Sequence, residues 1–120
     1  SPKRCFDMGA EVARICAESP YRVALIASSS WSHAFLCDKN HRMTPDVEFD
    51  KKMYDALTRN DYDFWKSKTL AETTDSGNQE MLNWMALLGA MNSLDRKLTW
   101  SDFVETHLFN SSKVAAIYNP

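Results

Sequence analysis

Two side chains in this sequence combine a residue type and a position suited to chemistry: His33 and Glu80. His33 follows an apolar run at residues 23–27 and the serines at residues 28–30. Imidazole is the side chain best suited to moving a proton near neutral pH, so His33 is a candidate general acid or base. The alternative is a histidine that only forms hydrogen bonds within a loop, and this stretch alone favours that alternative.

Glu80 is the single charged residue in an otherwise apolar segment, residues 80–91. If the segment is a helix, Glu80 shares one face of it with Trp84 and Leu87. A carboxylate that faces a core is costly unless it is paired or binds a metal ion. Two other roles stay open: Glu80 could cap the helix, whose N-terminus favours the ionised form, or it could pair with a basic side chain.

The elements that must position these side chains alternate between helix and strand. Apolar spacing predicts helices at residues 3–18, 44–60 and 76–93, with one or two short helices at 62–74. Thr44 with Pro45 is typical of a helix start, and Ser76 with Gln79 has the pattern of a capping box. The run 23–27 is typical of a strand buried on both faces, as in a parallel sheet, and residues 98–108 and 113–118 are predicted to pair through a turn at 109–112.

This order predicts an α/β fold: a partial α/β/α sheet with a buried strand flanked by helices, and a strand pair at the C-terminus. Ligand sites in open α/β sheets lie beyond the carboxyl ends of buried strands, which is where His33 falls. Helix 44–60 is expected to bury Phe49, Met53 and Leu57 and to leave Asp50 in solvent.

Length and composition limit the classes of function. A chain of 120 residues suits one domain, residues 1–120. The net charge of −2, from 14 basic and 16 acidic residues, gives no electrostatic case for binding nucleic acid or a membrane surface. No apolar run is long enough to cross a bilayer. The three cysteines lack CxxC spacing, so we expect free thiols, a reducing compartment and a cytoplasmic protein.

Three segments carry a resemblance to a known family. They are Cys-Phe-Asp-Met-Gly at residues 5–9, the apolar run followed by Ser32 and His33, and Gly-Asn-Gln-Glu-Met-Leu-Asn-Trp at residues 77–84. With these segments in order, and an apolar closing segment at 114–117, the chain resembles the C-terminal half of the class III extradiol ring-cleavage dioxygenases. This is the family of the protocatechuate 4,5-dioxygenase catalytic subunit, and the resemblance covers essentially the whole chain.

The resemblance implies a non-haem Fe(II) enzyme that cleaves catecholic rings with O2 in the catabolism of aromatic compounds. Family members bind iron through two histidines and one glutamate, which leaves coordination positions for substrate and O2. By the match, Glu80 is the implied carboxylate ligand, and His33 is the implied acid/base beside the metal. Trp31 stands where members often have a smaller residue, so we expect its ring to narrow or reshape the substrate pocket.

The chain also departs from the family in its metal ligands. The two histidine ligands come from the N-terminal half of family members, which this chain lacks, and neither His41 nor His107 lies in a matching motif. We therefore expect an upstream portion or a second subunit to supply them, and the isolated chain to have little or no activity. A half-domain would also expose apolar surface, which favours a homo-oligomer.

Two further functions stay open. The first is a non-catalytic assembly subunit that keeps the dioxygenase scaffold, in which Glu80 only caps or pairs. The second is a metal-dependent hydrolase on a similar scaffold, which would be active without O2.

Overall fold

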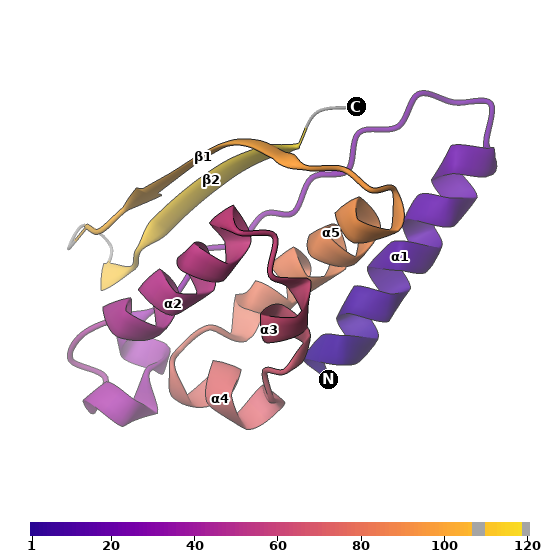
Figure 1. The fold of residues 1–120 in the computed structure, drawn as a ribbon. Coiled ribbons are helices and arrows are strands. Elements are labelled where there is room, and N and C mark those ends of the chain that lie inside the picture. The colour runs from indigo at the N-terminus through magenta and orange to yellow at the C-terminus, as the bar shows by residue number, and fades with distance from the viewer. Residues whose placement is uncertain (107–109, 119–120) are drawn as a thin grey trace.

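The computed structural model describes residues 1–106 and 110–118. These residues form a mixed α/β fold with a C-terminal strand pair, which confirms the predicted fold class (Figure 1). The helices are α1 (Pro2–Glu18), α2 (Val47–Thr58), α3 (Tyr62–Lys66), α4 (Leu70–Asp75) and α5 (Leu82–Ser93). The strands are β1 (Leu98–Val104) and β2 (Lys113–Tyr118), and short 3-10 turns occur at Ala34–Leu36, Asp38–Asn40 and Gln79–Met81.

Helices α1 and α5 lie side by side with their backbones in direct contact (Figure 1). A Cβ atom added to Gly9 of α1 would meet the backbone of Ala86, and one added to Gly89 of α5 would meet the backbone of Phe6. The two glycines therefore permit an approach that no larger residue would allow. This contact fixes α5, whose first turn lies beside Glu80.

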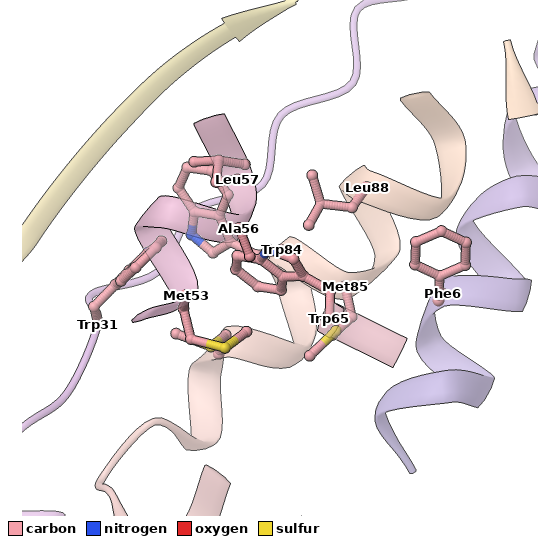
Figure 2. Packing of buried hydrophobic residues seen from close by; sticks show 10 residues of the cluster. Phe6, Trp31, Met53, Ala56, Leu57, Trp65, Trp84, Met85 and Leu88 are labelled. Carbon is pink, nitrogen blue, oxygen red and sulfur yellow. The ribbon is translucent and has the colours of Figure 1, made fainter. Parts of the chain in front are cut away.

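The core is built around tryptophan rings from separate parts of the chain (Figure 2). Trp31 has no exposed surface, and it makes edge contacts with Trp65, Trp84 and Phe103 at centroid distances of 5.9, 5.6 and 6.3 Å. Such aromatic pairs stabilise a core beyond the area that they bury. Trp31 thus lies in the core of the described residues, and its expected effect on the shape of a substrate pocket stays a prediction.

Strands β1 and β2 pair antiparallel from Leu98 with Tyr118 to Val104 with Lys113. The pair covers α2, where the Tyr54 hydroxyl lies 2.9 Å from Ser101 Oγ (Figure 1). The predicted pairing is confirmed for these residues. Residues 107–108 of the first predicted strand, His107 among them, and the first residue of the predicted turn lie outside the described part of the chain.

The buried strand predicted at residues 23–27 is not formed within the described part of the chain. The segment follows α1 without forming a strand, and the exposed fractions of Val23, Leu25 and Ile26 are 54%, 43% and 84%. The prediction was wrong because a strand exists only with a hydrogen-bonded neighbour, and the described residues place none beside this run.

Two helix starts and the place of the capping box also differ from the prediction. Asp46, not Thr44, caps α2 by accepting a hydrogen bond from the Phe49 N–H at 3.1 Å. The capping box lies at Thr69 and Glu72, where it opens α4. The segment after Ser76 first forms the 3-10 turn, so α5 begins six residues later than predicted, at Leu82.

Candidate functional site

The segment that carries His33 and the turn that carries Glu80 are joined along their length. The His33 N–H donates a hydrogen bond to the Gly77 carbonyl at 3.0 Å. At the other end, the Asn83 Nδ2 donates to the Ser28 carbonyl at 3.0 Å. The structure therefore brings together two segments that lie about fifty residues apart in sequence.

Gly77 makes the close approach at His33 possible. Its φ of +74° lies in the left-handed region, which residues with a side chain rarely adopt. A Cβ atom at this position would lie 2.5 Å from the His33 carbonyl oxygen. Both the backbone conformation and the available space therefore require glycine.

His33 and Glu80 face one another at the junction, the place where the segment 28–33 meets the segment 77–83. The His33 Nε2 lies 3.8 Å from the Glu80 Oε2, and the same carboxylate oxygen accepts a hydrogen bond from the Ser30 N–H at 3.1 Å. The exposed fractions of the two side chains are 16% and 54%. Glu80 thus does not face the core as the helical pattern suggested, because the 3-10 turn before α5 directs it outward.

The other ring nitrogen of His33 has its own environment. Nδ1 is buried and has no hydrogen-bond partner among the described residues. The ring also packs against Phe35 at a centroid distance of 5.0 Å. The imidazole is therefore held by packing on one side, and its Nε2 edge is left facing the Glu80 carboxylate.

A second carboxylate, that of Asp50, is buried and contacts both segments of the junction. Asp50 of α2 is fully buried, contrary to the expectation that it is solvated. Its Oδ1 accepts hydrogen bonds from the Ser32 N–H at 3.3 Å and the Asn78 Nδ2 at 3.0 Å, and its Oδ2 accepts one from the Ser32 hydroxyl. Burial raises the pKa of Asp50, and the hydrogen bonds from Ser32 and Asn78 oppose that rise.

The fit of a metal ion can be tested against the side chains present. Glu80 offers a partly exposed carboxylate of a type that Fe(II) accepts, with His33 beside it. Within residues 1–106 and 110–118, no group of three histidine, cysteine or acidic side chains could hold a metal. His41 is exposed at the end of the Asp38–Asn40 turn, and His107 is not described. The described residues thus fit as one part of a metal site.

Sequence reasoning found both members of the pair but missed the residues that hold them. Asp50 stands beside Lys51 and Lys52, which made it look solvated, yet it lies three and seven residues before the buried Met53 and Leu57. That helical spacing places Asp50 on the same face of the helix as two buried residues, and so could have predicted its burial. Nothing local predicted the bonds of Ser30, because its partner lies fifty residues away.

One comparison with known proteins identifies a family for this chain. The family model described as the catalytic LigB subunit of aromatic ring-opening dioxygenase matches residues 1–117. The chain therefore belongs to this family, which confirms the resemblance found in the sequence. Membership implies an aromatic substrate and O2. No curated protein and no solved structure matches the chain.

Across the described residues, no helix combines the length and apolar character needed to cross a membrane.

Proposed function

We propose that this chain supplies the Glu80 and His33 side of the active site of a non-haem Fe(II)-dependent extradiol dioxygenase that opens catecholic rings. The observation that carries this proposal is the convergence of a carboxylate and an imidazole, with 3.8 Å between Glu80 Oε2 and His33 Nε2. Membership of the ring-opening dioxygenase family supplies the class of reaction.

Glu80 is the residue that would hold the iron. Its carboxylate is more than half exposed, and the Ser30 N–H fixes one of its two oxygens, so the group is both accessible and oriented. When bound, Fe(II) would bring the paired hydroxyls of a catechol and O2 together for insertion of both oxygen atoms into the ring-opened product.

His33 would move the proton. In this proposal Nε2 accepts a proton from a substrate hydroxyl and later returns it, which suits an imidazole near neutral pH. Its backbone is tied to Gly77 and its ring is packed against Phe35, so the nitrogen is held at a fixed place beside the carboxylate. Such positioning is a large part of general acid–base catalysis.

The remaining two ligands would come from outside the described residues, as histidines of an upstream segment or of a second subunit. The uncovered run at residues 23–27 supports this idea. Among the described residues its backbone finds no strand partner, and the apolar side chains of Val23, Leu25 and Ile26 stay exposed. A sheet that paired with this run would end beside His33 and could present ligands to Glu80.

The three cysteines are free, as predicted, which supports a reducing compartment such as the cytoplasm.

A second candidate function is a non-catalytic assembly subunit. It is favoured by the bond between Glu80 and the Ser30 N–H, which already gives the carboxylate a structural partner.

Activity measurements separate these functions. The chain, with and without an upstream segment that carries two histidines, would be loaded anaerobically with Fe(II) and given protocatechuate and O2. We expect O2 uptake and ring-opened product with the extended chain. The His33→Gln change should lower kcat by about 10²–10⁴-fold, the usual contribution of a general acid or base. The matched His41→Gln change should leave kcat unaltered.

Two results would reject the dioxygenase. Turnover that proceeds without O2 would indicate a hydrolase. An extended chain that binds iron and substrate but consumes no O2 would leave the assembly subunit as the better account.

A further inference from the structure

The buried carboxylate of Asp50 has no part in the chemistry proposed above, yet it touches both segments that carry the site. It binds Ser32, the residue before His33, through the N–H and the hydroxyl. It also binds Asn78, two residues before Glu80, through the side-chain amide. One buried side chain therefore joins the segment that carries His33 to the turn that carries Glu80.

Asp50 is itself held on a rigid support. It lies in the first turns of α2, whose Met53 and Leu57 are buried in the core, and its own exposed fraction is zero. Asn78 is further fixed by a hydrogen bond of 3.2 Å from its Nδ2 to Ser76 Oγ. Both oxygens of the Asp50 carboxylate accept hydrogen bonds, and a satisfied buried polar group holds its partners in one geometry, so this arrangement resists sliding of either segment.

We propose that Asp50 is a positioning residue, whose carboxylate sets the distance between His33 and Glu80 by holding Ser32 and Asn78 in register. The proposal rests on the proposed function for its catalytic meaning, but its structural content concerns the chain alone. A buried acid that served only stability would contribute to the free energy of unfolding without controlling where the His33 ring lies.

The test reads the His33 ring directly in the metal-free chain. The protein would be labelled with 15N-histidine, and the ring signals assigned with His33→Gln and His41→Gln. Asp50→Leu has nearly the same shape but accepts no hydrogen bonds. We expect it to shift or split the His33 signals and to leave those of His41 unchanged. The matched Asp55→Leu change, at an exposed position of α2, should move neither.

A conservative variant adds a second readout. Asp50→Asn keeps one acceptor oxygen for the Ser32 N–H and the Asn78 amide, so it should restore His33 signals close to those of the parent chain. A folded Asp50→Leu chain with unchanged His33 signals would overturn the proposal. If Asp50→Leu fails to fold, Ser32→Ala removes the hydroxyl bond alone, and unchanged His33 signals in that variant would overturn the proposal equally.

The two proposals can fail separately. If His33 responds to Asp50 but no iron or ring cleavage is found, the dioxygenase proposal fails and the positioning role stands. In an active, iron-loaded complex, Asp50→Leu should lower kcat by about 10–100-fold, as expected for a catalytic group displaced by up to an ångström, with KM changed much less.

Discussion

Substitution of Gly77 by alanine tests the junction that brings His33 to Glu80. The new Cβ atom would lie 2.5 Å from the His33 carbonyl oxygen, whereas ordinary contact begins at 3.4 Å, so the two segments must separate by about 0.9 Å. Alanine at a φ of +74° also costs about 1–2 kcal/mol, and forced repacking typically adds about 1–3 kcal/mol. We therefore expect Gly77→Ala to lower the free energy of unfolding by about 2–5 kcal/mol.

Urea denaturation followed by circular dichroism would measure this loss. Asn60→Ala is the matched control, because Asn60 also has a positive φ, of 55°, but already carries a Cβ atom. It should lose only about 1 kcal/mol. The reasoning is refuted if Gly77→Ala costs no more than Asn60→Ala, since the close approach to His33 would then have no energetic consequence.

Three other substitutions test the packing and the buried acid. Gly89→Ala should destabilise the chain by about 3 kcal/mol or more, because the new Cβ atom would meet the Phe6 backbone. Glycine-to-alanine changes inside exposed helices usually stabilise instead. A rise in Tm would therefore contradict the close contact between α1 and α5. Trp31→Ala should cost about 3–5 kcal/mol, against about 1 kcal/mol for the half-exposed Trp100→Ala; equal losses in urea denaturation would mean that Trp31 is not enclosed. Burial raises the pKa of Asp50 above its usual 3.8, so its protonated form stabilises the fold below pH 3.8 and that contribution is lost as the pH rises through the folded-state pKa. The stability of the parent chain relative to Asp50→Asn should therefore fall as the pH rises above 3.8, and a constant difference would contradict the raised pKa.

The sequence predicted the parts of the fold that depend on neighbours in the chain. The helical pattern of α1 and α5 is local, and so is the apolar alternation of the strand pair. The run at residues 23–27 has the composition of a buried strand, but a strand needs a hydrogen-bonded neighbour, which the described residues do not supply. Composition could therefore indicate what the run is suited to form, and not whether it forms.

The candidate site shows the same division. His33 and Glu80 were found because their types and positions suggested chemistry. The hydrogen bonds of Asp50 were missed because two lysines follow this residue in the sequence, and because its partners Ser32 and Asn78 are distant in sequence. The packing of the Trp31 ring against Trp65, Trp84 and Phe103 was also not predicted, because these partners are distant in sequence.

The central claim is that Glu80 is an iron ligand. The most direct test is an anaerobic titration of Fe(II), monitored by calorimetry, into the chain extended by an upstream segment with two histidines. The account predicts about one iron per chain, and at least tenfold weaker binding for Glu80→Gln because a metal ligand is lost. Glu48→Gln, an exposed glutamate paired with Lys52, should bind iron as the parent does. Equal affinity of the Glu80→Gln and parent chains, or no iron bound by either, would contradict the assignment of Glu80 as an iron ligand.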